Sequence, residues 1–444
     1  MEGTLNFIAF KRSPIGRMLL SASAVVVLQG VSIAMGFLLS VLLARFLGSR
    51  GYGLYALAFA WSSFLMIPAI LGLDRFLVRG IAVYEVHEKW QLMKGLLRRT
   101  SQLVLLTSTM IAACGMIVAA TSLSFQLRGP FGVAMLLIPI TTLTMLRQGA
   151  MQAVGHIVSG QLPEYLIRPL LIVVGVIVLE LVGGGALTPT SALGVNVAAV
   201  AVAFVVGAVL LRRALPIALH SVSPEFLTRE WLRASLPMML INSAWMANLY
   251  AATLVVGTLD GARGAGVYNV VQKGAELIVM LLYATNMALA PTIARLHTRD
   301  DTQSLEHTVE RIARATLLLS APIAIAFIAF PNIYLGLFGP GFHTGASALI
   351  IVVLGQLFNA IAGPTGTVLI MTGHERVAAR GVAVGLLANV VLAIVLVPLL
   401  GVTGGAIAFT SSLVLWNTVL VVLARRLVGI NVTVFHRLSV AGSV

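Results

Sequence analysis

Almost the whole chain is built from long apolar stretches separated by short polar breaks. A helix needs about 20 mostly apolar residues to cross the hydrocarbon core of a bilayer, where every backbone polar group must be hydrogen-bonded within the protein. The composition agrees, because 59% of the 444 residues are hydrophobic and only 10% are charged, a balance far from that of soluble domains. The sequence therefore predicts an all-α integral membrane protein.

Twelve of these stretches qualify as transmembrane helices. They cover residues 18–43, 53–73, 101–121, 131–154, 166–183 and 191–211, and then 236–258, 266–291, 315–334, 345–371, 381–399 and 403–424. We expect two six-helix lobes around a central cavity, over residues 1–211 and 236–444, joined by a cytoplasmic linker at 212–235. The first stretch follows basic residues as in a signal peptide, but it is too long for one, so we interpret it as a retained helix.

The basic residues are distributed unequally over the two sides that these helices define. Of the 29 Lys and Arg residues, 23 lie at the side of the termini, counting Arg168 at the start of the span 166–183, four lie at the opposite side, and Arg147 and Lys273 fall well inside spans. The positive-inside rule therefore predicts that both termini are cytoplasmic. The net charge of +14 lies mostly at helix ends, so we expect no nucleic-acid partner. Segments 85–99 and 295–314 carry mixed charges typical of helices on the membrane surface, which would contact membrane lipids.

An internal repeat connects the two halves of the chain. Arg-Gly-x-Gly-x-Tyr occurs at 50–55 and again at 263–268, an offset of 213 residues, and the Arg-Arg pair at 212–213 recurs at 425–426 with the same offset. Two sequence matches with the same offset indicate that the two lobes are duplicated. Each lobe has an even number of helices, so the lobes should be related by an axis along the membrane normal, and transporters often bind substrate between such lobes.

Two longer motifs resemble a known family. The turn between the first two helices reads Ala44-Arg45-x-Leu47-Gly48-x-x-x-Tyr52-Gly53-x-Tyr55, and the turn before the last helix reads Pro398-x-x-Gly401-x-x-Gly404-x-Ala406-x-Ala408. Both are similar to turns of the bacterial oligosaccharide and polysaccharide flippases. These flippases belong to the superfamily that also contains the multidrug and toxin extrusion transporters.

This resemblance implies a flippase that carries undecaprenyl-diphosphate-linked oligosaccharide units across the bacterial cytoplasmic membrane by alternating access, for surface polysaccharide assembly. The implied partners are the lipid-linked oligosaccharide and membrane lipids. A coupling cation, H+ or Na+, and a polysaccharide polymerase are further candidates. Two alternatives stay open: a cation-coupled multidrug or toxin exporter, and a lipid II flippase, whose relatives typically have two further helices.

One polar face of the predicted helix 266–291 is the main candidate site. Asn269, Gln272, Lys273 and Glu276 follow each other at helical spacing, and ionisable groups inside a membrane usually face a wet cavity or one another. We expect the first three to bind substrate, with Lys273 near a phosphate, and Glu276 to couple transport to a cation. The alternative is that Lys273 and Glu276 only neutralise each other.

Other polar residues inside the predicted helices are further candidates. The guanidinium of Arg147 suits a diphosphate, unless Arg147 extends to the cytoplasmic interface instead. Gln356 and Asn359, with Asn242 and Gln29, carry amide groups that suit sugars, although such groups serve interhelical hydrogen bonds equally well. Two cations well inside the spans, Arg147 and Lys273, against Glu276, the one acid clearly inside a span, favour an anionic substrate.

The sequence also argues against other classes of function. It contains no Gly-x-x-x-x-Gly-Lys motif, no outer loop long enough for a polymerase or ligase, and no nucleophile or metal-ligand motif. Cys114 is the single cysteine and has no cysteine partner within the chain. We therefore expect a transporter rather than an enzyme, with no cofactor and no metal.

Overall fold

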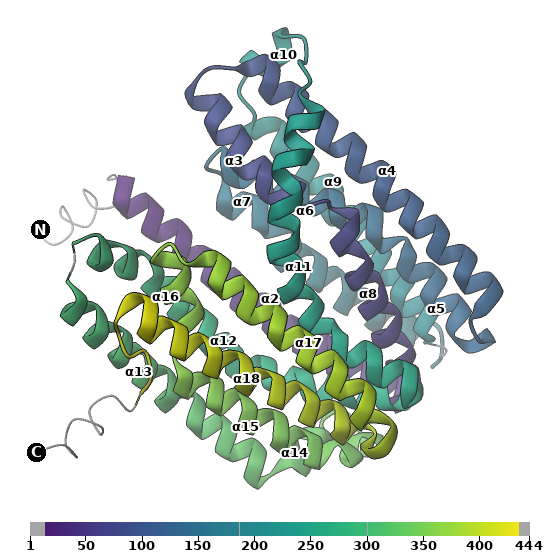
Figure 1. Ribbon diagram of the computed structural model, residues 1–444. Coiled ribbons are helices and arrows are strands. Elements are labelled where there is room, and N and C mark those ends of the chain that lie inside the picture. The colour runs from purple at the N-terminus through teal and green to yellow at the C-terminus, as the bar shows by residue number, and fades with distance from the viewer. Residues whose placement is uncertain (1–13, 186, 300, 435–444) are drawn as a thin grey trace, which may run out of the picture. The chain divides into compact units, whose positions relative to one another are not determined.

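The computed structural model describes residues 14–185, 187–299 and 301–434 (Figure 1). Side chains are described throughout these ranges except at residues 14–23, 220, 237, 240–245, 281, 283, 284, 287, 288 and 291. Within the described ranges all regular secondary structure is helical. This agrees with the expected all-α fold.

The chain forms two compact units. Unit 1 consists of Met1–Phe46 and Trp61–Leu240, and unit 2 consists of Leu47–Ala60 and Ile241–Val444. The chain therefore passes between the units inside α2 (Pro14–Ala69) and inside α11 (Thr228–Leu259). The short segment 47–60 lies within the predicted N-terminal lobe but packs in unit 2.

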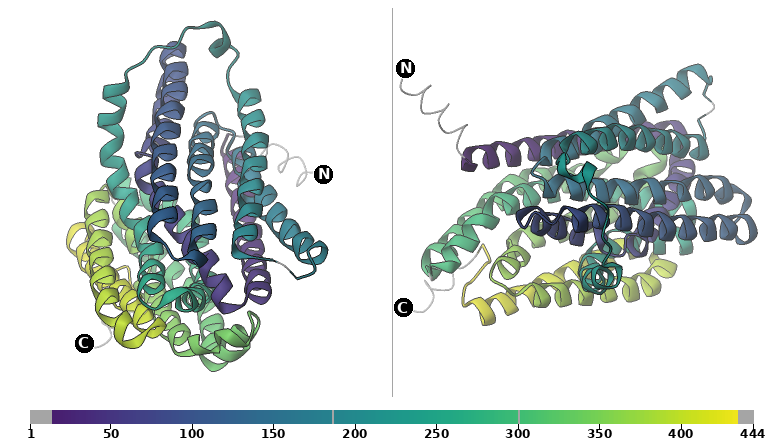
Figure 2. Two further views of the ribbon diagram at one scale, coloured as in Figure 1. Left: turned by 90° about the vertical axis from the view of Figure 1, so that its right-hand side faces the viewer. Right: turned by 90° about the horizontal axis from the view of Figure 1, so that it is seen from above.

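The remaining helices divide between the units by their position in the chain, and Figure 2 shows them from two further sides. Unit 1 contains α3 (Leu73–Val86), α4 (Trp90–Ser122), α5 (Phe125–Met135), α6 (Leu137–Ala153), α7 (Ile157–Leu162), η1 (Pro163–Ile167), α8 (Arg168–Val182), α9 (Pro189–Ala214) and α10 (Ala218–Ser221). Unit 2 contains α12 (Gly261–Thr298), α13 (Thr302–Ala329), α14 (Pro331–Gly336), η2 (Pro340–Gly345), α15 (Ala346–Ala362), α16 (Thr365–Met371), α17 (Glu375–Leu400) and α18 (Val402–Val428).

The long element α2 contains the first two predicted spans. Gly48 interrupts it with φ 67° and ψ 177°, a backbone conformation outside the helical region. Glycine reaches positive φ without the steric cost of a Cβ atom. The break lies between the predicted spans 18–43 and 53–73, so α2 consists of two helical arms that meet at Gly48.

Nine helices of the described residues are long and apolar enough to cross a membrane. They are Ala24–Ala69, Trp90–Ser122, Phe125–Ala153, Ile157–Val182, Pro189–Ala214, Thr302–Ala329, Pro340–Ala362, Glu375–Leu400 and Val402–Val428. Many of their apolar side chains point outward: on α4, for example, Leu106 is 59% exposed and Ile117 is 63% exposed. Apolar side chains on outer helix faces are the pattern expected for helices that contact lipid.

Several helices extend beyond the predicted spans. α4 begins at Trp90 and α13 at Thr302, so much of segments 85–99 and 295–314 continues these helices instead of forming separate surface helices. The charged residues end the apolar pattern in the sequence, but they do not end the helix. In the other direction, the predicted span 345–371 stops at Ala362, because Gly363 has φ 74° and α16 starts a new helix at Thr365.

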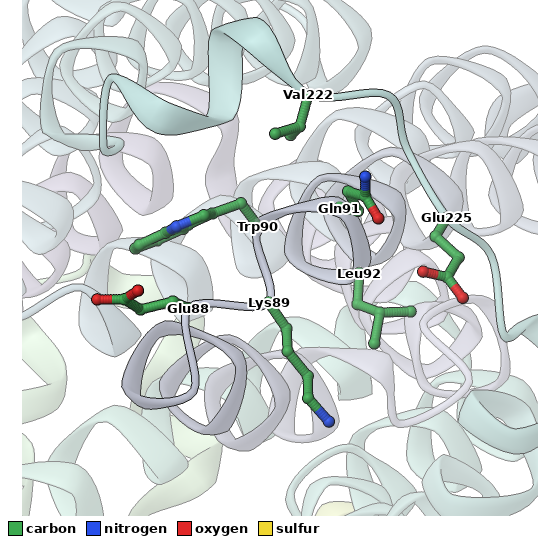
Figure 3. Close-up of a pocket in the computed structure, with 7 residues that line it drawn as sticks. All are labelled: Glu88, Lys89, Trp90, Gln91, Leu92, Val222 and Glu225. Carbon is green, nitrogen blue, oxygen red and sulfur yellow. The ribbon is translucent and has the colours of Figure 1, made fainter.

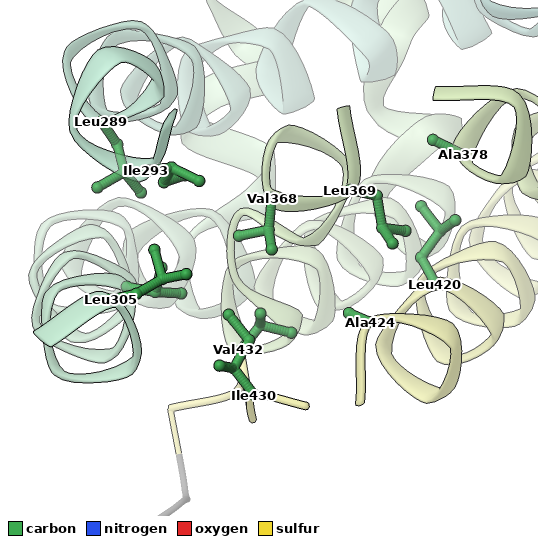
Figure 4. Packing of buried hydrophobic residues seen from close by; sticks show 11 residues of the cluster. Leu289, Ile293, Leu305, Val368, Leu369, Ala378, Leu420, Ala424, Ile430 and Val432 are labelled. Carbon is green, nitrogen blue, oxygen red and sulfur yellow. The ribbon is translucent and has the colours of Figure 1, made fainter. Parts of the chain in front are cut away.

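Each unit has its own apolar core. In unit 1, Leu73 and Leu77 of α3 are buried with Leu96 of α4 and Leu146 of α6. In unit 2, a cluster joins one end of α12 to α13, α16, α17 and α18 (Figure 4). The segment after α18 completes this cluster by burying Ile430 and Val432. Apolar packing therefore holds each helix set together internally.

Candidate substrate-binding site

Lys273 and Glu276 form an ion pair on α12 of unit 2. The distance between Lys273 Nζ and Glu276 Oε2 is 2.7 Å, and the two side chains are 27% and 53% exposed. A spacing of three residues places them on one helix face. The pair therefore combines mutual neutralisation with access from outside the core of unit 2.

The two amides beside this pair are hydrogen-bonded to buried tyrosines. Tyr52 Oη donates to Asn269 Oδ1 at 2.7 Å, and Gln272 Nε2 donates to Tyr268 Oη at 2.8 Å. Tyr52 and Tyr268 are among the largest fully buried side chains of the described residues. Since these partners are fixed in the core, the amide groups have defined orientations next to the charged pair.

A row of aromatic rings packs beside this face of α12. Tyr52 stacks on Tyr55 at 6.4 Å and meets Phe342 edge to face at 6.1 Å between ring centroids. The row continues through Phe338 to Tyr334, whose Oη donates to the carbonyl oxygen of Val270 on α12 at 2.9 Å. Aromatic pairs of this geometry add to the stability of a core, so they hold α12 and its polar face in place.

Arg147, on α6 of unit 1, lies inside the helix packing and is only 4% exposed. Its Nη1 donates to the carbonyl oxygen of Gly160 at 3.5 Å. A Cβ atom on Gly207 of α9 would overlap the guanidinium, so that glycine makes the space that the side chain occupies. The guanidinium is therefore enclosed by the helices of unit 1 in this conformation.

An acid that sequence reasoning had missed lies near Arg147. Glu164 belongs to the π turn η1, and its Oε2 is 3.0 Å from Nη1 of Arg168, whose Nη2 donates to Asn196 Oδ1 at 3.2 Å. The sequence predicted a span only from residue 166, but the candidate span starts at Ile157. Glu164 therefore lies inside a helix that is long and apolar enough to cross a membrane.

The remaining unit 1 candidate also has a side-chain partner. Gln29 Nε2 donates to Tyr165 Oη at 3.3 Å. On α6, directly after Arg147, Gln148 Nε2 donates to Gln161 Oε1 of α7 at 3.0 Å. Polar side chains thus link α2 and α6 to the segment that contains Glu164.

The amides of α15 form an interhelical chain in unit 2. Asn359 Nδ2 donates to Gln356 Oε1 at 3.2 Å, and Asn417 Nδ2 of α18 donates to Asn359 Oδ1 at 3.1 Å. Gln356 is 4% exposed. The chain connects α15 to α18, which is a structural role for amides in apolar surroundings. Asn242 is a further candidate whose side chain lies outside the described residues.

A depression of about 400 Å³ lies at one end of unit 1, between the start of α4 and the segment that follows α10. Lys94 Nζ donates to the carbonyl oxygen of Val222 at 2.8 Å, and the backbone N–H of Glu225 donates to the carbonyl oxygen of Gln91 at 3.0 Å. Figure 3 shows Glu88 and Glu225 at opposite ends of the group of side chains that lines this depression. Among the described residues, no group of three or more His, Cys, Asp or Glu side chains is arranged to hold a metal ion.

Comparison with known proteins identifies related families and folds. The sequence matches the family described as "Polysaccharide biosynthesis protein" over residues 19–297, and the MatE family over residues 237–395. It is 22% identical over 167 residues to a probable low-salt glycan biosynthesis flippase of Haloferax volcanii, which is 37% of this chain and 35% of that protein. The chain spans about a third of the length of the curated relatives it matches.

Two solved structures have the same overall fold. A multidrug resistance MATE family transporter of the MOP superfamily, in an inward-facing conformation, matches with a TM-score of 0.74 at 15% identity, covering 90% of this chain and 94% of that chain. The lipid II flippase MurJ, in an inward closed conformation, matches with a TM-score of 0.68 at 14% identity, covering 92% of this chain and 87% of that chain. The chain therefore has a MATE-like and MurJ-like fold, which makes it a multi-pass membrane protein.

Proposed function

Because the chain belongs to the polysaccharide biosynthesis protein family, which it matches from residue 19 to residue 297, we propose that it is a flippase for lipid-linked oligosaccharides. It is a membrane transporter of the MOP superfamily and not an enzyme. The substrate that we propose is an undecaprenyl-diphosphate-linked oligosaccharide. It would move from the inner to the outer leaflet of a bacterial cytoplasmic membrane and serve surface polysaccharide assembly.

The observation that carries this proposal is the environment of Lys273. Its ammonium is paired with Glu276 at 2.7 Å but stays accessible, and the oriented amides of Asn269 and Gln272 lie on the same helix. An accessible ammonium attracts phosphate oxygens, whereas amides donate to and accept from sugar hydroxyls. One helix face therefore offers groups for both parts of a sugar linked to a diphosphate.

The proposed transport cycle is alternating access of two six-helix lobes around a central cavity, with twelve transmembrane helices and both termini in the cytoplasm. The lobes correspond to residues 1–211 and 236–444, and residues 212–235 form the cytoplasmic linker. The motif repeated at an offset of 213 residues supports this duplication.

Glu276 is the proposed coupling residue, because its carboxylate is 53% exposed beside Lys273 and a proton or sodium ion could therefore reach it. The neutral variant Glu276→Gln should weaken the dependence of transport on a proton or sodium gradient. Its folding should be close to that of the parent protein, since a neutral amide is cheaper to hold in a membrane than a carboxylate. If the gradient dependence of transport is unchanged, the coupling site is not Glu276.

A multidrug exporter is the second candidate, supported by the MatE match over residues 237–395 and by the TM-score of 0.74 with a MATE transporter. The charge on α12 argues against it, because organic cations are attracted by acids that are not already paired with a lysine. A lipid II flippase is the third candidate, supported by the TM-score of 0.68 with MurJ.

Reconstituted vesicles separate the three candidates. The purified protein would be placed in liposomes with a fluorescent polyprenyl-diphosphate oligosaccharide, with lipid II, or with a fluorescent organic cation. We expect protein-dependent movement of the oligosaccharide carrier, which would be at least about ten-fold faster than movement of the other two. Transport of the organic cation alone would contradict the flippase proposal. Transport of lipid II alone would show that lipid II is the substrate instead of the lipid-linked oligosaccharide.

A further inference from the structure

Three charged side chains from α6, η1 and α8 lie near one another inside unit 1. Arg147 projects from α6, Glu164 from η1 and Arg168 from α8, and the charge of Glu164 acts on Arg147 as well as on Arg168. Arg147 is 4% exposed, and the side chain of Glu164 is 9% exposed. The group thus contains two cations and one anion in a region that water hardly reaches, where charges interact strongly.

Two buried donor atoms and one buried acceptor atom of this group lack hydrogen-bond partners. Arg147 Nε and Nη2 are buried without a hydrogen-bond partner among the described residues, and so is Glu164 Oε1. Nε and Nη2 form one edge of the planar guanidinium, the arrangement that binds a carboxylate through two parallel hydrogen bonds. An open donor edge and an open acceptor oxygen therefore lie in the same buried region.

The backbone that carries Glu164 is irregular at this point. Residues 163–167 form a π turn, closed by a hydrogen bond from the N–H of Arg168 to the carbonyl oxygen of Pro163. A π turn holds one residue more than an α-helical turn, and such turns occur frequently at functional sites. Converting the turn to α-helical geometry would rotate Glu164 relative to Arg168 and change the partner that its carboxylate can reach.

We propose that Glu164 is a two-position counterion that pairs with Arg168 in this conformation and with Arg147 in a second conformation of unit 1. Glu164 is then a positioning residue: it decides whether the donor edge of Arg147 is open or occupied. That consequence for transport rests on the proposed flippase function and on the prediction from the sequence that Arg147 binds the diphosphate. The exchange of Glu164 between Arg168 and Arg147 does not rest on the proposed function.

A double-mutant cycle of thermal unfolding temperatures, measured in detergent, tests the exchange without any substrate. In the parent protein, Arg147→Met removes an unpaired buried cation, so the unfolding temperature should stay the same or rise. Arg168→Met should be tolerated, because Glu164 can turn to Arg147. In the Arg168→Met protein, however, adding Arg147→Met leaves Glu164 without a partner, and the unfolding temperature should fall by several degrees.

The opposite pattern would overturn the exchange. If Glu164 serves Arg168 alone, Arg168→Met strands the acid and lowers the unfolding temperature, and adding Arg147→Met causes no further fall. Should Arg168→Met fail to fold until Glu164→Gln is added, the conclusion is the same. The matched control is Arg314→Met, since Arg314 pairs with Glu310 at the same spacing in unit 2. It should combine additively with Arg147→Met.

A transport measurement at equal membrane abundance adds the functional consequence. Arg168→Met should reduce oligosaccharide flipping about ten-fold although the protein is stable, because Glu164 now occupies Arg147. Adding Glu164→Gln should restore most of the rate, since it frees Arg147 again. If the thermal cycle shows the exchange but Arg168→Met flips normally, the substrate role of Arg147 is contradicted and the exchange stands.

Discussion

A Cβ atom placed on Gly266 would lie 3.0 Å from the backbone nitrogen of Gly53, and one placed on Gly53 would lie 3.0 Å from the backbone nitrogen of Gly266. These glycines occupy the same position in the two copies of the repeated motif, 213 residues apart. The carbonyls around them are reciprocal too, since that of Ala262 faces Gly53 and that of Ser49 faces Gly266. The repeat therefore brings α2 and α12 into backbone contact within unit 2.

This contact predicts that alanine is not tolerated at Gly53. A methyl group there would overlap the carbonyl oxygen of Ala262, and overpacking of this kind costs about 1–3 kcal/mol or more because backbone cannot move aside easily. We expect Gly53→Ala to lower the thermal unfolding temperature and the transport rate. The control is Gly132→Ala, because a Cβ atom on Gly132 of α5 meets nothing within 4 Å. Equal unfolding temperatures of the two variants would contradict the close contact.

The proposed orientation predicts which exposed residues can be labelled from outside the cell. Replacing Cys114, the single cysteine, by alanine gives a background without thiols. In it a cysteine at His343 of η2 should react with an impermeant thiol reagent in intact cells, and one at Arg299, just after α12, should react only after permeabilisation. Both positions are exposed, so burial does not prevent reaction. The reverse labelling pattern would place the termini outside.

Asp301 makes the start of α13 sensitive to acid. Its Oδ1 accepts a hydrogen bond from the backbone N–H of Ser304 at 3.0 Å, and this bond, followed by one from the Ser304 side chain, keeps the pKa of Asp301 below its usual value. A carboxyl whose folded pKa is lowered stabilises the fold above its unfolded pKa, and the contribution is lost as pH falls through the folded pKa. We therefore expect weaker anchoring of the first turn of α13 in acid.

Hydrogen exchange of residues 302–306, corrected for intrinsic rates, measures this effect. Protection should fall between pH 7 and about pH 3 in the parent protein. In Asp301→Asn, which keeps an uncharged cap, it should change much less. The same pH dependence in both proteins would show that the carboxylate does not control this helix end.

The positions of the membrane helices could be predicted because apolar stretches report directly on contact with lipid. The structure has helices at 189–214 and 402–428, where the sequence predicted spans at 191–211 and 403–424. The polar ends could not be predicted in the same way. α4 continues from Trp90 through charged residues, because helix propensity does not require apolar side chains.

Only those contacts of the candidate site that join residues close in the sequence could be predicted. The Lys273 and Glu276 contact follows from their spacing of three residues. The bond between Tyr52 and Asn269 joins residues 217 positions apart, and no local pattern indicates it. Glu164 was missed because the predicted span begins at residue 166, two residues after it. The π turn that includes Glu164 was not predicted.

Lys273 is the residue on which the proposed phosphate contact depends most. Loss of its charge should reduce flipping more than stability, because the neutral side chain no longer attracts phosphate but is also cheaper to hold in the membrane. Lys273→Arg should keep much of the activity, since it retains a cation that binds phosphate. Lys273→Ala should lose most of it.

The decisive measurement is flipping by the double variant Lys273→Ala with Glu276→Ala, compared with each single variant at equal membrane abundance. If Lys273 binds the diphosphate, the double variant should stay as inactive as Lys273→Ala, because removing the acid does not replace the phosphate contact. If Lys273 only neutralises Glu276, to which it is paired at 2.7 Å, removing both charges should restore flipping. An active double variant would therefore contradict the proposed role of Lys273.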